Sequence, residues 1–163
     1  MKNRNSEFWL TLTFLLATVI SSIAAYVFWY NLTFFMGPYL FVHWLGLIAI
    51  AFVAVSIPIQ YFVKRKRPQN FKTTLKIHTT GNLFAFSLIS IHFAQNVGRL
   101  SGALQRIGAG FALYLVLAVI MATGIMDRYQ TKRSRYIKAT HKYTVIILYL
   151  IMLIHALEGF NIL

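Results

Sequence analysis

Five long apolar runs occupy most of this 163-residue sequence, and each is long enough to cross a lipid bilayer as a helix. A bilayer core requires about 20 apolar residues per helix. The runs are Phe8–Tyr30, Leu40–Val63, Thr73–Ala94, Ala103–Met126 and Lys142–Phe160. Because backbone hydrogen bonds in hydrocarbon must be satisfied within the segment, we expect helices rather than strands. The sequence therefore predicts an all-α integral membrane protein with five transmembrane helices.

The composition excludes several other classes of protein. Hydrophobic residues make up 58% of the chain and charged residues only 12%, about half the charged fraction of a typical soluble domain. Sixteen Lys and Arg against three acidic residues give a net charge of +13, yet the basic residues form short clusters between apolar runs, which argues against nucleic-acid binding. The sequence has no Cys, which excludes disulfides, thiolate iron–sulfur clusters and Cys–His zinc sites.

The basic clusters also predict an orientation. Fourteen of the 16 basic residues lie before the first run or at the junctions of the second with the third and the fourth with the fifth. The other two, Arg99 and Arg106, lie between the third and fourth runs. Positive residues favour the cytoplasmic side, so we expect an inner N-terminus, an outer C-terminus and a multi-pass protein of the plasma membrane.

Four of the five histidines repeat one spacing on two predicted helices. His78 and His92 are fourteen residues apart in the third run, and His141 and His155 are fourteen apart in the fifth. Fourteen residues are just under four helical turns, so each pair lies on one face of its helix, about 21 Å apart along the axis. Both helices run outward, so His78 shares an inner depth with His141 and His92 an outer depth with His155.

Two imidazoles at the same depth on facing helices are the ligand set of a six-coordinate haem iron. We therefore predict two bis-histidine, low-spin haem b groups, with residues 38–163 forming a haem-binding four-helix bundle and residues 1–37 an N-terminal anchor helix. Zinc or copper would require three or four ligands converging on one point. A single intramembrane His is often an interhelical hydrogen-bond partner or a proton-relay residue. Such roles do not readily explain four histidines that repeat one spacing on two helices.

Other residues are candidates for supporting the cofactor. Gly110 and Gly124 in the fourth run are also fourteen apart, Gly81 lies close after His78, and Gly46 lies in the second run. These four glycines are predicted to leave room for a porphyrin edge. Arg99 and Arg106 are candidates for the outer propionates. Lys76, Lys138 and Lys142 are inner candidates, although topology alone explains them equally well. His43, Trp44 and Glu158 are polar residues near the outer side that could adjoin a quinone.

The residues around His78 resemble a known family. The stretch H-T-T-G-N-L-F-A-F-S-L-I-S-I-H from His78 to His92 resembles the second core helix of cytochrome b from quinol–cytochrome c oxidoreductases, and the helix with Gly110 and Gly124 is similar to its glycine-bearing third helix. His141 and His155 then match the ligands of its fourth helix. The resemblance covers about Leu40 to Phe160 and implies a di-haem electron-transfer subunit. The family's Pro-Glu-Trp-Tyr quinol-oxidation motif is missing from this sequence.

A second resemblance leaves an alternative open. The segment R-S-R-Y-I-K-A-T-H-K, from Arg133 to Lys142, resembles the basic approach to the fifth helix in membrane domains of ferric reductases and NADPH oxidases. We therefore expect either a cytochrome subunit of a respiratory or quinone-linked complex, or a self-contained oxidoreductase acting on a metal, superoxide or a quinone. The expected partners are membrane lipid, a quinone and other subunits. A haem-free transporter fits less well, because the spans lack internal carboxylates and broken-helix repeats.

Overall fold

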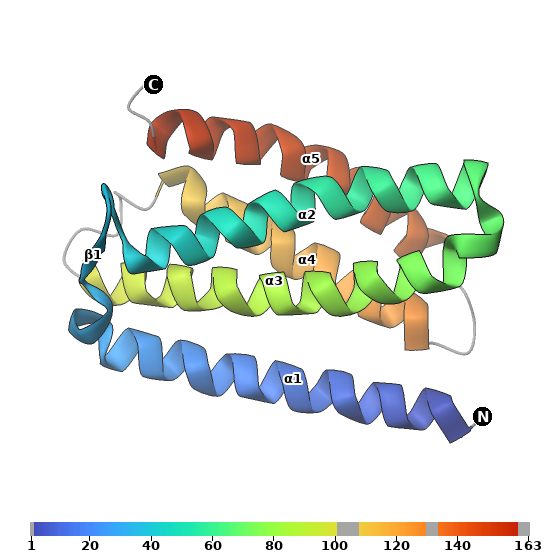
Figure 1. The fold of residues 1–163 in the computed structure, drawn as a ribbon, viewed down its shortest axis with the longest axis horizontal. Coiled ribbons are helices and arrows are strands. Elements are labelled where there is room, and N and C mark those ends of the chain that lie inside the picture. Colours follow the sequence, from blue (N-terminus) through green and yellow to red (C-terminus); the bar gives the residue numbers. More distant parts are fainter. Residues whose placement is uncertain (1, 101–107, 130–133, 160–163) are drawn as a thin grey trace. The chain divides into compact units, whose positions relative to one another are not determined.

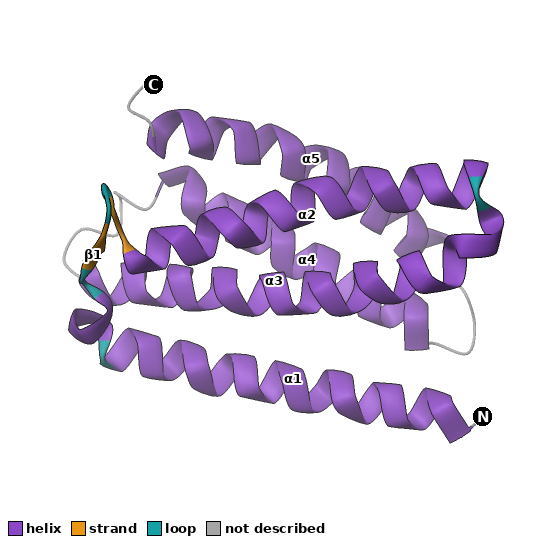
Figure 2. Cartoon of the chain, viewed as in Figure 1, coloured by secondary structure: helices purple, strands orange, loops and turns teal. Residues whose placement is uncertain are grey.

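The computed structural model describes residues 2–100, 108–129 and 134–159, and this part of the chain is almost entirely helical (Figures 1 and 2). Its elements, in chain order, are α1 (Lys2–Val27), the 3-10 helix η1 (Trp29–Leu32), β1 (Phe35–Met36), β2 (Tyr39–Leu40), α2 (Phe41–Lys66), the 3-10 helix η2 (Pro68–Asn70), α3 (Phe71–Arg99), α4 (Gly108–Tyr129) and α5 (Arg135–Gly159). The predicted all-α class is confirmed apart from one very short hairpin.

That hairpin lies between α1 and α2, where Gly37 and Pro38 separate the first two apolar runs of the sequence. Its two-residue strands pair antiparallel, with Phe35 opposite Leu40 and Met36 opposite Tyr39. Gly37 has a φ of +69°, a conformation that side-chain-bearing residues rarely adopt, and Pro38 completes the tight turn. The Trp44 indole donates a hydrogen bond to the Met36 carbonyl at 2.6 Å, which fixes the hairpin to the first turn of α2.

The chain divides into two compact units, residues 1–99 and residues 100–163. In the first unit, α3 packs against both α1 and α2. Thr18 of α1 and Ser87 of α3 share a hydrogen bond between their hydroxyl oxygens at 2.5 Å, and Phe14 meets Phe84 edge to face. The first helix, which the sequence suggests is an anchor, is thus packed on the helix that carries His78 and His92.

Close approach at the end of this interface depends on Gly98. A Cβ atom at this position would lie 2.7 Å from the Tyr26 carbonyl oxygen and 3.0 Å from the Trp29 Cβ. The Gln95 side chain is completely buried beside it, with its Nε2 3.4 Å from the Trp29 carbonyl oxygen. The α1–α3 contact therefore extends along α3 to its last turns.

In the second unit, α4 and α5 pack against each other as an antiparallel pair. Gly124 lies against His141, and Gly110 lies against His155. Between these two contacts α4 runs back by fourteen residues while α5 runs forward by fourteen, so the helices are antiparallel. Leu117 and Leu148 are buried almost completely. Each histidine of α5 thus has a glycine of α4 as its neighbour.

The lengths and apolar surfaces of the helices identify a multi-pass membrane protein. Among the described residues, four segments are long and apolar enough to cross a membrane, namely Ser6–Val27, Phe41–Lys66, Gly108–Tyr129 and Arg135–Gly159. Large apolar side chains such as Leu16, Ile20 and Ile23 remain more than half exposed, as expected where a helix faces lipid. The remaining helix, α3, is not one of the four, because Thr, Asn, Gln and His side chains interrupt its apolar surface.

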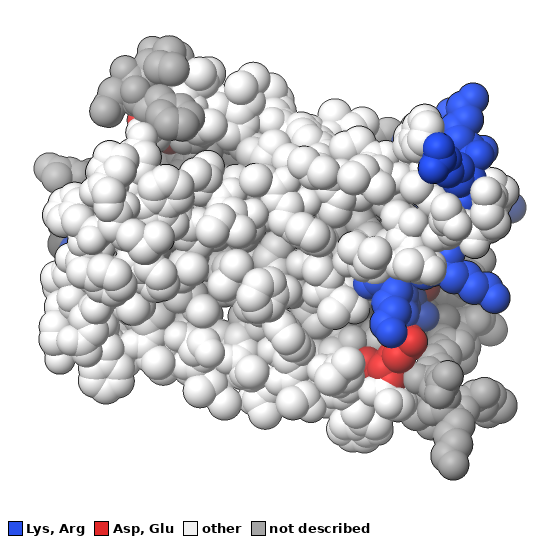
Figure 3. All heavy atoms as spheres, viewed as in Figure 1, with Lys and Arg blue, Asp and Glu red and all other residues white. Residues whose placement is uncertain are grey.

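Basic side chains gather at one end of the first unit, where α2 passes into α3 (Figure 3). Four of them, Lys64 to Arg67, end α2 or directly follow it, and Lys72 and Lys76 lie in the first turns of α3. Cations at the C-terminus of α2 interact favourably with the helix dipole. In the second unit, Arg128 lies in the last turn of α4 and Arg135 begins α5.

Candidate functional site

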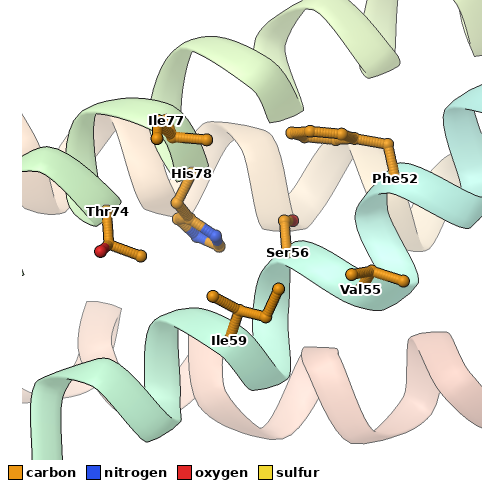
Figure 4. Close-up of a pocket in the computed structure, with 7 residues that line it drawn as sticks. All are labelled: Phe52, Val55, Ser56, Ile59, Thr74, Ile77 and His78. Carbon is orange, nitrogen blue, oxygen red and sulfur yellow. The ribbon is translucent and has the colours of Figure 1, made fainter.

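His78 lies on α3 at the edge of a small groove between α2 and α3 (Figure 4). The groove has a volume of about 100 Å³, and only apolar atoms form its surface. Its other lining residues are Phe52, Val55, Ser56, Ile59, Thr74 and Ile77. The His78 imidazole is therefore held in surroundings of low polarity, where each hydrogen bond to it is strengthened.

The amide of Asn82, one turn after His78, contacts the imidazole. Its Nδ2 lies 3.1 Å from the His78 Nδ1 and 3.4 Å from its Nε2. The Asn82 Oδ1 accepts a hydrogen bond from the Ser56 hydroxyl of α2 at 2.8 Å. A continuous hydrogen-bonded chain thus runs from α2 through Asn82 to His78.

His92, the second histidine of α3, is bonded to backbone instead. Its Nδ1 lies 2.8 Å from the carbonyl oxygen of Val42, a fully buried residue of α2. A carbonyl oxygen only accepts, so the His92 Nδ1 must carry the proton and the Nε2 the lone pair. Gly46 lets α2 approach the ring, since a Cβ atom there would lie 3.2 Å from the imidazole Cγ.

The residue that corresponds to Asn82 is Asn96, one turn after His92. Its Nδ2 donates to the His92 carbonyl oxygen at 2.8 Å, and its Oδ1 accepts a hydrogen bond from the Arg99 Nη2 at 3.0 Å. The Asn96 Nδ2 is 3.5 Å from the His92 Nδ1, at the limit of hydrogen-bond distance. Asn96 therefore links Arg99 to the helix backbone, and the Arg99 guanidinium lies close to the end of α3 that carries His92. Arg106 lies outside the described residues.

His141 of α5 has the same type of partner as His92. Its Nδ1 is 3.2 Å from the Ile120 carbonyl oxygen and 3.1 Å from the Thr123 hydroxyl, both on α4. The Ile120 carbonyl oxygen only accepts, so the His141 Nδ1 carries a proton and is the donor to α4. The Thr123 hydroxyl is itself within hydrogen-bond distance of the Val119 carbonyl at 2.7 Å. A Cβ atom at Gly124 would lie 3.3 Å from the His141 Cε1.

His155 lies even closer to α4. A Cβ atom at Gly110 would be 3.1 Å from the His155 Cε1, tighter than ordinary van der Waals contact. Gly110 and Gly124 thus give room to the imidazoles themselves, whereas the sequence suggests room for a porphyrin edge. Gly81 contacts a different group. A Cβ atom there would collide with the Phe52 ring, so this glycine accommodates α2.

The three polar candidates His43, Trp44 and Glu158 lie in different surroundings. The His43 ring lies 5.5 Å from the His92 ring, centroid to centroid, and meets Tyr39 edge to face. The Trp44 indole donates its hydrogen bond to the Met36 carbonyl of the hairpin. The Glu158 carboxylate lies near Gly108 in the second unit, 3.5 Å from where a Cβ atom of that glycine would stand.

Sequence reasoning missed the hydrogen-bonding neighbours of the histidines. Asn82 and Asn96 each follow a histidine of α3 by four residues, so the pattern H-x-x-x-N occurs twice at the same fourteen-residue interval. Side chains four apart meet on one helix face, so this repeat could have identified both asparagines. Thr123 carries no comparable signal, because its contact with His141 depends on the register of the neighbouring helix.

No protein-family model, no curated protein and no solved structure matches the chain.

Proposed function

We propose that the chain is a b-type di-haem cytochrome that carries electrons across the membrane as a subunit of a respiratory or quinone-linked complex. The main support is one repeated arrangement: two histidines on α3 and two on α5, with the same fourteen-residue interval on both helices. Two helices with equally spaced histidines can supply two ligand pairs at two depths.

The surroundings of the imidazoles fit an iron ligand. A histidine that binds metal commonly donates its second ring N–H to a backbone carbonyl or a similar acceptor, which fixes the tautomer and the ring orientation. His92 donates through its Nδ1 to Val42, and His141 donates through its Nδ1 to Ile120 and Thr123. In both residues the lone pair is on Nε2, the nitrogen that would bind iron.

In this proposal His78 and His141 hold the inner haem, and His92 and His155 hold the outer haem. Bound haem supplies the one-electron redox chemistry. The helices hold the imidazoles at two depths, about 21 Å apart along each axis. Apolar side chains line the groove beside His78, and Gly46, Gly110 and Gly124 let neighbouring helices approach the other rings.

The proposal includes α3 as the fifth transmembrane helix, with the N-terminus inside and the C-terminus outside. A 29-residue helix is roughly 43 Å long, enough to span a bilayer. Its polar side chains are engaged by neighbouring helices, as the Thr18–Ser87 and Ser56–Asn82 contacts show. Polar groups bonded within the protein are tolerated at membrane depth.

Arg99 supports the proposed outer haem through its position. It lies at the outer end of α3 and is oriented by Asn96, close to the helix face that carries His92. Haem propionates are anionic, and Arg pairs well with carboxylates. We assign Arg106 the same role, and a quinone, other subunits and the plasma membrane complete the proposed setting.

Absorption spectroscopy of the purified protein and two histidine variants tests this function. Dithionite reduction should give the sharp bands of low-spin haem b. His92→Ala should remove half of the haem, because it removes one ligand of one pair. His43→Ala is the matched control, since its ring adjoins His92 but has no place in either pair. Full haem content in His92→Ala, or a protein without haem, would overturn the proposal.

A further inference from the structure

His78 differs from His92 and His141 in the partner of its Nδ1. The Nδ1 of His78 contacts a side-chain amide, whereas the Nδ1 atoms of His92 and His141 contact backbone carbonyls. The Asn82 amide has a donor at one end and an acceptor at the other. A flip of this amide, which turns it over, exchanges its oxygen and its nitrogen with little change in shape. The partner of His78 can therefore act either as a donor or as an acceptor.

In the structure the hydrogen bonds run toward His78. The Ser56 hydroxyl donates to the Asn82 Oδ1 at 2.8 Å, and the Asn82 Nδ2 donates to the His78 Nδ1 at 3.1 Å. An accepting Nδ1 has no proton, so a neutral His78 ring then carries its proton on Nε2. This tautomer cannot bind iron through Nε2.

With the Asn82 amide turned over, the same three residues bond in the opposite direction. The His78 Nδ1–H then donates to the Asn82 Oδ1, and the Asn82 Nδ2 donates to the Ser56 oxygen. The Ser56 hydroxyl proton turns to the Val53 carbonyl, which lies 3.3 Å away. Every donor keeps an acceptor, and the His78 Nε2 now has the lone pair that a metal requires.

We propose that Ser56 and Asn82 are positioning residues of His78, and that the Asn82 amide turns over when His78 binds haem iron. This inference rests on the proposed di-haem function. It adds that the two α3 ligands differ: the Val42 carbonyl fixes the tautomer of His92, whereas that of His78 is adjustable. Asn96 corresponds to Asn82 in position but not in its contacts, because its amide bonds to the His92 backbone carbonyl and to Arg99.

Nuclear magnetic resonance of ¹⁵N-histidine in the haem-free full-length protein tests the amide orientation without haem. The His78 Nδ1 should show the shift of an unprotonated nitrogen, and Asn82→Asp should change it to a protonated one, because a carboxylate only accepts. The ¹⁵N shifts of His92 should not change in Asn82→Asp. A protonated His78 Nδ1 in the wild-type protein, or no change in Asn82→Asp, would overturn the proposed orientation.

Redox titration of the haem-loaded protein tests the positioning role. Asn82→Leu removes an acceptor from the His78 Nδ1–H and so makes the ligand less basic. At a fixed ambient potential, the reduced-to-oxidised ratio of one haem should rise about tenfold, or 59 mV for a one-electron couple. Asn82→Asp should shift the same haem in the opposite direction, and Ser56→Ala should shift it less.

Asn31→Leu is the matched control, because this asparagine is exposed in η1 and has no role in either proposed haem site, and it should leave both potentials at the wild-type values. Equal shifts in Asn82→Leu and Asn31→Leu, shifts of the same sign in Asn82→Leu and Asn82→Asp, or no shift in either Asn82 variant would overturn the positioning role. Absence of haem from the wild-type protein would instead overturn the proposed function, while the tautomer measurement would still report on Ser56 and Asn82.

Discussion

Gly110 and Gly124 determine how closely α4 approaches the imidazoles of α5. At Gly110 even a methyl group would stand 3.1 Å from the His155 ring, so a branched side chain must displace the ring. We expect Gly110→Val to remove one haem and to lower the free energy of unfolding by about 1–3 kcal/mol. Haem content and unfolding of the purified variant measure both effects.

Gly159→Val is the matched control, because no atom of the described residues lies within 4 Å of a Cβ atom at that position. It should bind as much haem as the wild type. If Gly110→Val also bound two haem groups at wild-type stability, His155 would not need the space that this glycine provides.

Gln95 is a buried residue whose amide is poorly satisfied. Its side chain is 0% exposed, its Oε1 has no hydrogen-bond partner in the described part of the chain, and its Nε2 makes only a 3.4 Å contact. We expect Gln95→Leu to leave the free energy of unfolding unchanged or to raise it by up to about 1 kcal/mol, because an apolar side chain of similar size loses little.

Gln95→Ala separates packing from hydrogen bonding. It leaves a cavity against Trp29 and should destabilise the protein more than Gln95→Leu does. Reversible unfolding in detergent gives both values. A larger loss in Gln95→Leu than in Gln95→Ala would show that the amide has a partner essential to the α1–α3 contact.

At the scale of elements, the contact between α1 and α3 makes the first helix part of the unit that carries His78 and His92. Thr18 and Ser87 each also lie within hydrogen-bond distance of a carbonyl four residues earlier. Each hydroxyl has a single proton, so one of the two donates to its own helix carbonyl and the other donates across the interface. A double-mutant cycle of Thr18→Val and Ser87→Ala should give a coupling energy of about 0.6 kcal/mol, the average for such bonds between membrane helices.

Thr74 offers a control on the same helix as Ser87, roughly 20 Å away along the α3 axis. Within the part of the chain that the structure describes, its hydroxyl bonds to the Asn70 carbonyl, directly before the start of α3, at 2.9 Å. A cycle of Thr18→Val and Thr74→Val should give no coupling. Zero coupling between Thr18 and Ser87 would mean that α1 contributes nothing specific to α3 through these hydroxyls.

The helices themselves could be predicted from hydropathy, but their ends could not. The fifth helix begins at Arg135, seven residues before the predicted Lys142, because a helix continues into the basic region outside the apolar core. The first ends at Val27 and gives way to η1, whereas the apolar run continues to Tyr30. The predicted start of the fourth run at Ala103 lies outside the described residues.

The candidate site, like the helices, could be predicted from the sequence only in part. The fourteen-residue spacing of the histidines can be read from the sequence, and so can the matching glycines of α4. The hydrogen-bond partners depend on which carbonyl or hydroxyl the neighbouring helix presents, as with Val42 and Thr123. Such contacts follow from helix register, which no single residue pattern encodes.

At the scale of the whole molecule, the membrane orientation is open to a direct test, because the chain has no Cys of its own. Asn31 and Gln69 are both exposed, at opposite ends of α2 and its flanking turns. With an inner N-terminus, Asn31→Cys should react with a membrane-impermeant maleimide in intact cells. Gln69→Cys should react only after permeabilisation, because the basic cluster beside it favours the cytoplasm. The reverse labelling pattern would contradict the orientation.

The pairing of α3 with α5 is predicted from their equal histidine spacing, and it makes the haem content the decisive quantity. A pyridine haemochrome assay with protein quantification on the purified full-length chain measures this content directly. Two haem b groups per chain are expected, falling to one in His78→Ala and His141→Ala alike, since these two residues form one pair. A wild-type ratio of zero or one, or a loss in only one of these variants, would contradict the account.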